Sequence, residues 1–364
     1  ATSSANNLMA TLHKLKEVSQ EMCQSADTVI RVAEYLVYGK TCVENLKKMI
    51  FSDTSIPNII PFIGHGNVLF ESSGDECHTV GLQFALQALK QTAPGQLAIT
   101  VINPELRPEF SAFTRLQEFQ MLTKIDEIKD FLVGITEELV DIDKLLQGRY
   151  NSLVELRKAA QQPVGRLRLI VVQDMPQTQD GDYRNQLTRI MRGASRAGIT
   201  VLFLSSKNVA VDSALMKTIS SFSNFSTYQL KGNQWRSSTH GCEQFTYEFP
   251  ISDGTTVSNE ISELIEATKK SSVITIPFNQ IEDMEHMWTE DASEHIIFNL
   301  GKSGLDTVSV CIGDKVTQHH NILISGAVGK GKSNLLEVMI HSLCWRYSPK
   351  ELELYLLDFK DGLR

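Results

Sequence analysis

The sequence predicts an α/β fold in which a module with a parallel sheet is preceded by an α-helical segment and followed by a truncated second module of the same kind. Three observations carry this prediction. Strand-like runs alternate with helix-period runs after residue 57, a glycine-rich loop lies between a strand-like run and a helix-period run near residue 330, and the pattern around that loop recurs earlier in the chain. Strands that alternate with helices are typical of a parallel sheet. We therefore expect three parts, residues 1–56, 57–265 and 266–364.

The first part has the spacing of amphipathic helices. Apolar residues recur every three or four positions from Leu8 to Met22 and again from Val29 to Ile50, with a break near Ser25. This spacing places them on one helix face. We expect two helices that pack on each other, because so few heptads favour a hairpin over a coiled-coil site for a partner.

Four strand-like runs and one long helix dominate the middle part. The helix is predicted between Ile125 and Leu146, where apolar side chains form one continuous stripe. Core packing explains that stripe without a cofactor. Residues 205–265 mix turn signals with short apolar runs. The predicted strands of the parallel sheet are Val68–Glu71, Leu97–Ile102, Leu167–Val172 and Ile199–Leu204.

Residues 326–333 read Gly-Ala-Val-Gly-Lys-Gly-Lys-Ser, which matches the phosphate-binding pattern G-x-x-x-x-G-K-[ST] without a mismatch. A strand-like run, Asn321–Ile324, precedes the loop, and a helix-period run follows it. Glycines let successive backbone N–H groups converge on phosphate oxygens, and the helix N-terminus adds its dipole. We expect ATP and Mg²⁺ here, with Lys332 as the catalytic residue at the β/γ-phosphates and the Ser333 hydroxyl on the metal. The expected nucleotide-binding residues are Gly326, Ala327, Val328, Gly329, Lys330, Gly331, Lys332, Ser333 and Asn334.

The pattern around this loop recurs at a displacement of 255 residues, which brings Gly326 onto Glu71. The same displacement brings Leu352–Asp358, a strand-like run, onto Leu97–Asn103. The identities are few, but the apolar pattern holds from the loop through its helix to the next strand. The chain is therefore predicted to hold two copies of one nucleotide-binding module.

The first copy lacks the residues that a phosphate chain needs. Cys77 stands at the position of Lys332, and His78 stands at that of Ser333, so no fixed cation faces the β/γ-phosphates. A Cys–His nucleophile pair is disfavoured, because adjacent residues point in different directions. Three acidic side chains would also repel an anion in this loop, namely Glu71, Asp75 and Glu76.

The metal side of the first copy is weakened as well. The strand that ordinarily delivers a carboxylate to Mg²⁺ ends in Gln173, and only Asp174 remains. An amide is a poorer Mg²⁺ ligand than a carboxylate. We therefore expect the first copy to have lost hydrolysis.

Composition places the chain among ordinary globular proteins. It is 42% hydrophobic and 21% charged, and its net charge of −8 gives no global attraction to nucleic acid. Its six cysteines form no C-x-x-C pair, which favours reduced thiols in a cytoplasm. We expect no membrane segment and no signal peptide, because the sequence has no apolar run of the required length. The chain begins without Met and stops one strand past the loop, so we expect a fragment of a longer protein.

Taken together, these segments resemble the FtsK/SpoIIIE family of ATP-driven DNA translocases. The resemblance covers roughly residues 60–210 and 290–364, and only the loop is specific by itself. It implies a RecA-like motor fold, a homo-oligomeric ring, and ATP hydrolysis coupled to the movement of a polymer, with double-stranded DNA as the expected partner. The similar segments are residues 149–156, 167–174, 186–206, 319–333 and 348–362.

Two other functions stay open beside the DNA motor. Tandem modules with one degenerate copy also occur in the type VII secretion branch of that family, which moves protein. In that case the first copy would serve as a docking platform. The third possibility is a nucleotide-dependent interaction protein that does not hydrolyse ATP. Without the resemblance, the residues of the second copy predict only that it binds a magnesium–nucleotide complex.

A row of arginines marks one predicted helix in the middle part. Three of them are spaced by three and four residues, which places them on one face. They would suit a channel lining or a trans-acting arginine for a neighbour's phosphate, but a solvated basic face is the favoured interpretation. The residues are Arg184, Arg189, Arg192 and Arg196.

Overall fold

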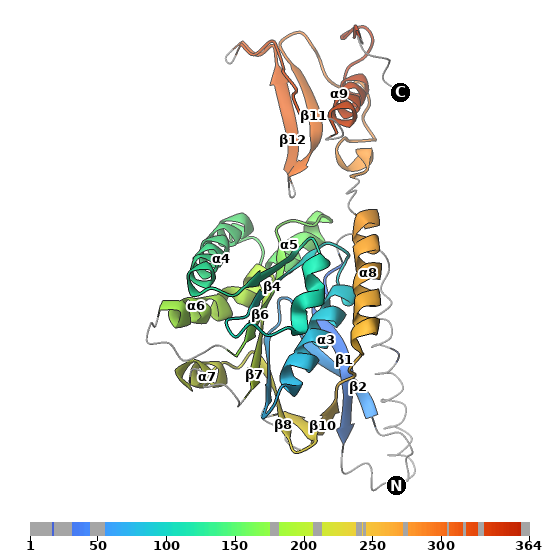
Figure 1. Cartoon of the computed structure of the whole chain (residues 1–364). Coiled ribbons are helices and arrows are strands. Elements are labelled where there is room, and N and C mark those ends of the chain that lie inside the picture. The colour runs from blue at the N-terminus through green and yellow to red at the C-terminus, as the bar shows by residue number, and fades with distance from the viewer. Residues whose placement is uncertain are drawn as a thin grey trace, which may run out of the picture. The chain divides into compact units, whose positions relative to one another are not determined.

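The computed structural model describes residues 17, 31–43, 55–174, 182–206, 213–237, 242, 245–271, 276–303, 306–315, 318–326 and 331–357. The chain divides into two compact units, Ala1–Val273 and Ile274–Arg364 (Figure 1). No helix among the residues just given is both long and apolar enough to cross a bilayer.

The first unit is built on a ten-stranded mixed sheet with the strand order β2-β1-β10-β9-β8-β3-β7-β6-β4-β5. Six neighbouring strands, from β8 through β3 to β5, pair in parallel, and the others pair antiparallel. The strands are β1 (Tyr35–Val43), β2 (Ser55–Pro61), β3 (Asn67–Ser72), β4 (Leu97–Ile102), β5 (Phe119–Leu122), β6 (Leu167–Gln173), β7 (Ile199–Ser206), β8 (Phe225–Lys231), β9 (Gln234–Ser237) and β10 (Phe245–Glu248).

The parallel half of the sheet confirms all four predicted strands, as β3, β4, β6 and β7. Every residue of β4 and β7 is buried. Parallel strands are apolar throughout because helices cover both of their faces. The prediction of a parallel sheet is therefore correct for this half and incomplete for the antiparallel extension.

Helices lie on both faces of this sheet, with α4, α6 and α7 on one side and α3 and α8 on the other (Figure 1). The predicted long helix is confirmed as α4, whose buried residues include Ile128, Leu132 and Ile135. The helices are α3 (Glu76–Gln91), α4 (Ile125–Leu146), α5 (Leu153–Ala160), α6 (Asp182–Ala197), α7 (Ser213–Ser220) and α8 (Gly254–Ser271), with a 3₁₀ helix η1 (Glu109–Arg115).

The predicted N-terminal helical segment is wrong over residues 35–43 and 55–56, which are strand residues. Tyr35–Val43 is strand β1, and Ser55 begins β2. Leu36 and Tyr38 are buried, while Val37 between them is partly exposed, so the period here is two. Antiparallel pairing with β2 and β10 satisfies the backbone of β1 and outweighs the helix-like spacing. Of residues 1–30 only Glu17 is described, so the first predicted helix lies outside the described residues.

The second unit contains a hairpin, a helix and segments without regular secondary structure. Strands β11 (Ile296–Ser303) and β12 (Asp306–Ile312) pair antiparallel, and α9 (Lys332–Arg346) follows the glycine-rich loop; a short 3₁₀ helix η2 (Phe278–Gln280) lies near the start. A small core joins the hairpin to α9 through Phe298, Leu343 and Tyr347. The Tyr347 hydroxyl accepts a hydrogen bond from the N–H of Ile297 at 2.7 Å, which ties the helix to β11.

Two strands predicted in this unit are not formed. Asn321–Ile324 and residues 352–357 have no regular secondary structure and pair with no strand among the described residues. Leu323, Tyr355 and Leu357 are exposed as a result. Their apolar side chains fit a strand pattern, but a strand is stabilised only by a neighbour that takes its backbone hydrogen bonds. Asp358 lies outside the described residues.

Candidate functional site

The helix that follows the glycine-rich loop begins at Lys332, as the phosphate-loop pattern predicts. Gly331 precedes it in the left-handed region, with φ 84, a conformation that glycine adopts without strain. The Lys332 ammonium reaches back across the loop, and its Nζ donates to the carbonyl oxygen of Gly326 at 2.7 Å. The structure thus brings the first and last parts of the predicted site together. Ala327, Val328, Gly329 and Lys330 lie outside the described residues.

The start of α9 fits a phosphate group. No side chain caps this N-terminus, so its first N–H groups keep their capacity to donate. Ser333 and Asn334 are both exposed at the same end of the helix. An uncapped N-terminus beside a lysine favours an anion through both hydrogen bonds and the helix dipole. These residues therefore suit the nucleotide and metal roles predicted for them.

The corresponding loop of the first unit is held by its own side chains. The Ser72 hydroxyl donates to the carbonyl of Gly74 at 2.6 Å and accepts from the N–H of Cys77 at 3.0 Å. The Glu76 carboxylate accepts from the N–H of Gly74 at 3.1 Å. Backbone groups that a phosphate would occupy in an intact loop are thus already paired within the loop.

The helix after this loop supports the internal repeat. A displacement of 255 residues brings α9 onto residues 77–91, and α3 spans Glu76–Gln91. Gly81 lets α3 approach β7, because a Cβ at this position would lie 2.4 Å from the Leu204 side chain. The two loops therefore share one strand–loop–helix position, although only the second retains the lysine.

His78 and Asp174 form a fully buried pair at the carboxyl ends of β3 and β6. His78 Nε2 lies 2.7 Å from Asp174 Oδ2, and both side chains are fully buried. The Gln173 amide nitrogen lies 3.3 Å from His78 Nδ1. Because an amide nitrogen only donates, Nδ1 accepts and the ring proton lies on Nε2, from which it is donated to Asp174. The imidazole thereby binds Asp174, the carboxylate that this strand end retains.

Arg107 closes the same site from the loop after β4. Its Nε lies 2.7 Å from Asp174 Oδ2, and its Nη1 lies 2.8 Å from Asp75 Oδ1. Its Nη2 donates to the Ser206 hydroxyl at 3.2 Å. The reciprocal backbone contacts of Asn103, both at 2.8 Å, hold Arg107 in this position. One guanidinium therefore pairs with two carboxylates, Asp174 and Asp75, at the carboxyl ends of the parallel strands.

Asp174 is further bound by the N–H of Ser206 at 2.6 Å. Burial by itself would raise the pKa of this carboxyl, but the hydrogen bonds from His78 and Ser206 and the charge of Arg107 together lower it. Asp174 stays ionised and fully paired. We call Arg107, Asp75, His78, Gln173, Asp174 and Ser206 the closed cluster.

Arg107, like Ser206, is a member of the closed cluster that the sequence did not indicate as a site residue. It follows a buried strand end but belongs to no recognised motif, and it reaches the loop from a separate part of the chain. The three acidic side chains that were expected to repel an anion from this loop each have a partner within the first unit. Asp75 binds Arg107, Glu76 binds Gly74, and Glu71 accepts from the Gln229 amide at 2.7 Å.

Cys77 is buried, and burial raises the pKa of its thiol to about 12. At pH 8 only about one thiol in ten thousand is then ionised, and the thiolate is the reactive form. We expect iodoacetamide to modify the exposed Cys311 and Cys344 while Cys77 stays unmodified in the folded protein. Peptide mapping by mass spectrometry checks this. Rapid native-state modification of Cys77 would show that the closed cluster opens.

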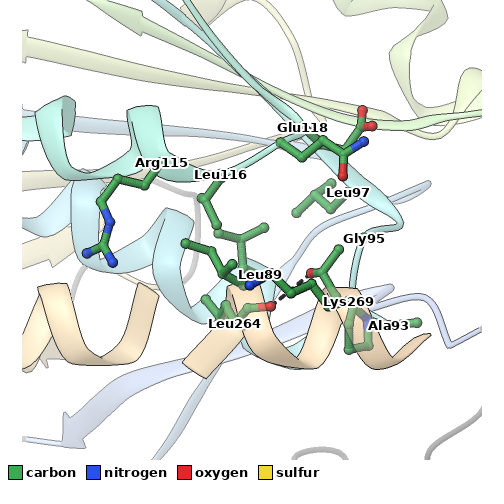
Figure 2. A pocket seen from close by; sticks show the side chains of 13 residues that line it. Leu89, Ala93, Gly95, Leu97, Arg115, Leu116, Glu118, Leu264 and Lys269 are labelled. Atoms are coloured by element: carbon green, nitrogen blue, oxygen red, sulfur yellow. Dashed lines mark hydrogen bonds between the residues drawn. The ribbon is translucent and has the colours of Figure 1, made fainter. Parts of the chain in front are cut away.

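The first unit also has an apolar pocket of about 360 Å³ between α3, α8 and the segment after η1. Leu89, Leu97 and Leu264 line its floor, and Arg115 and Lys269 lie at its rim (Figure 2). The Arg115 guanidinium donates to the Ser262 hydroxyl at 3.0 Å, and Lys269 pairs with Glu266 at 2.8 Å. Its volume and lining are those of a site for an apolar group.

The described residues contain no group of three or more histidine, cysteine, aspartate or glutamate side chains that would hold a metal ion. Ser333 is the protein ligand that the loop pattern provides.

The second unit is similar in sequence to known proteins. Residues 281–363 match the model of the FtsK/SpoIIIE family. Over 71 residues the chain is 31% identical to the DNA translocase FtsK of Clostridium tetani, a match that covers 20% of this chain and 9% of that protein.

Two solved structures share the fold. EssC (ATPases 2 and 3) from Geobacillus thermodenitrificans aligns with a TM-score of 0.51 at 13% identity, covering 87% of this chain and 66% of that one. The cytoplasmic domain of the type VII secretion ATPase EccC from Thermomonospora curvata aligns with a TM-score of 0.51 at 14% identity, covering 90% and 41%. This chain thus spans less than two thirds of each relative's length. Within residues 281–363, the chain is therefore similar to the FtsK/SpoIIIE family.

Proposed function

We propose that the second unit binds ATP with Mg²⁺ and that the chain is the ATP-binding part of a motor that exports protein. The contact across the loop between Lys332 and Gly326 carries the first half of this proposal. It positions an ammonium beside the uncapped N-terminus of α9, where a phosphate chain gains both a cation and free N–H donors.

Each residue of the loop has one role in this proposal. Lys332 binds the β/γ-phosphates, Ser333 holds Mg²⁺ through its hydroxyl, and the amides from Gly326 to Asn334 surround the phosphates. The metal neutralises the charge that develops on the phosphates. The Lys332 ammonium gives up the Gly326 carbonyl for a phosphate oxygen, a stronger acceptor because it is charged.

The closed cluster supports an unequal division of work between the units. Arg107 and His78 already saturate Asp174, so we propose that the first unit binds no nucleotide and acts as a docking platform. EssC and EccC are ATPases whose fold this chain shares over 87% and 90% of its length. This likeness and the net charge of −8 favour protein over DNA as the moved polymer.

We propose the apolar pocket of the first unit as the docking position for an exported peptide. Its volume suits one or two apolar side chains, and Arg115 and Lys269 at the rim suit a peptide that also carries acidic residues. By resemblance, we further propose a homo-oligomeric ring in the cytoplasm.

DNA translocation is the second candidate. It is favoured by the 31% identity to FtsK over 71 residues, which exceeds the identity to either solved structure. The exposed arginines of α6 would then be available for phosphates. A nucleotide-dependent interaction protein without turnover is the third.

ATP turnover by the complete protein that contains this chain separates the three. We expect long duplex DNA to leave turnover unchanged and a leucine- and glutamate-rich peptide to raise it about threefold or more by engaging the pocket. Leu264→Trp, which fills the pocket, should remove the peptide effect and leave nucleotide affinity unchanged.

Stimulation by DNA that Leu264→Trp does not alter would favour the DNA motor instead. Turnover that responds to neither ligand but depends on Lys332 would remove the pocket from the proposal. Absence of turnover under every condition, with nucleotide binding retained, would leave the interaction protein.

A further inference from the structure

The face of the first unit formed by α4 and α6 carries opposite charges on two neighbouring helices. Helix α4 has seven acidic and two basic residues, whereas α6 has four arginines and one aspartate. The two helices pack side by side on one face of the sheet (Figure 1). One surface of the molecule is thus divided into an acidic and a basic half.

The outer stripe of α4 alternates acidic and apolar side chains. Asp130, Val133, Glu137 and Val140 follow one another at spacings of three, four and three residues, which places them on one line along the helix. Val133 is 43% and Val140 49% exposed. Asp130 and Glu137 have no ion pair with any residue that the structure describes.

Two arginines of the basic half also lack partners among the described residues. Arg196 pairs with Asp143 of α4 at 3.0 Å, but Arg189 and Arg192 have no ion pair or hydrogen bond with the described residues. Both line a groove of about 440 Å³ between the two helices. The floor of this groove is apolar. Leu139 packs against Gly193, because glycine has no side chain that would crowd it.

We propose that this face is the docking surface for a second copy of the same chain. In a two-fold arrangement, the acidic stripe of each α4 lies on the arginines of the partner's α6, and Val133 enters the partner's groove, whose rim includes Val140. A single two-fold rotation makes both contacts, because the acidic half and the basic half lie next to each other on one face. A head-to-tail contact, as in the proposed ring, needs complementary surfaces on different faces, so the ring and this two-fold contact would use different surfaces of the chain. This inference is independent of the nucleotide site.

Charge reversal tests this pairing. We expect the wild-type chain to dimerise at about micromolar concentration in sedimentation velocity. One double variant, Asp130→Arg with Glu137→Arg, reverses the acidic stripe, and the other, Arg189→Glu with Arg192→Glu, reverses the arginines. Each should raise the dissociation constant at least about tenfold. An equimolar mixture of these two double variants should form a heterodimer, because each then offers the charges that the other lacks. Lys217→Glu with Lys231→Glu, which makes the same charge change at two exposed sites elsewhere, should still dimerise.

Three results would overturn the proposal. They are a wild-type chain that stays monomeric up to about 100 micromolar, double variants that remain dimeric, and a mixture that shows no heterodimer although circular dichroism finds both variants folded. Dimerisation at high salt should weaken, since exposed charge pairs are screened.

Discussion

Lys332→Ala is expected to weaken the binding of magnesium–ATPγS by about 100-fold, which corresponds to roughly 2.7 kcal/mol. Lys332 is the first residue of α9, and its ammonium lies across the loop at the Gly326 carbonyl. Alanine keeps the helix but removes the cation that is aimed at the phosphates. Isothermal titration calorimetry of the 364-residue chain measures the effect, since the whole loop is present.

Lys330→Ala provides the matched control, because it removes the same charge two residues earlier in the same loop. We expect it to weaken binding less than about threefold, as the pattern leaves that position unrestricted. Cys77→Ala should leave the affinity unchanged, because we propose that the first unit binds no nucleotide. Equal losses from Lys330→Ala and Lys332→Ala would mean that the loop attracts ATP by net charge alone.

The parallel strands and the long helix α4 were accessible from the sequence because local patterns determine them. β4 and β7 are apolar throughout, and a run of that length between turn signals has few alternatives. The segment 35–43 shows the limit of this reasoning. Its apolar positions fit either a helix or a strand. The strand forms because β2 and β10 pair with this segment in the sheet. The strands predicted around residues 321–324 and 352–357 fail for the complementary reason, since no described strand pairs with them.

The same division applies to the two loops. The phosphate loop is a contiguous motif, and the helix start at Lys332 follows from it. The departure of the first loop from the phosphate-loop pattern was visible at Cys77 and Gln173, but the contacts that fill this loop were not. Arg107 comes from a separate loop and meets Asp174 only because β4 and β6 are neighbours in the sheet. Contacts between distant segments leave no periodic pattern in a sequence.

The closed cluster makes a second large effect predictable. Asp174→Ala leaves His78 without its buried acceptor and Arg107 without its nearest carboxylate. Removal of one partner from a buried ionic network costs about 3–5 kcal/mol, because the remaining polar groups stay desolvated. We expect amide protection in β6 and α3 to fall at least about a hundredfold in hydrogen-exchange mass spectrometry. Peptides of the second unit should be unaffected.

Two controls and a pH series identify the cause of this loss. Ser206→Ala removes two hydrogen bonds of its hydroxyl, one to Asp174 and one from Arg107, and should cost about 1–2 kcal/mol. Asp141→Ala, at an exposed carboxylate on α4, should cost less than about 0.5 kcal/mol. The lowered pKa of Asp174 means that its ionised form stabilises the fold above the ordinary carboxyl pKa, and that this contribution is lost as the pH falls through the lowered value. The stability difference between wild type and Asp174→Ala should therefore be constant from about pH 7 to 5 and narrow below about pH 4. A difference that stays constant into acid would assign the loss to packing and not to the charge of Asp174.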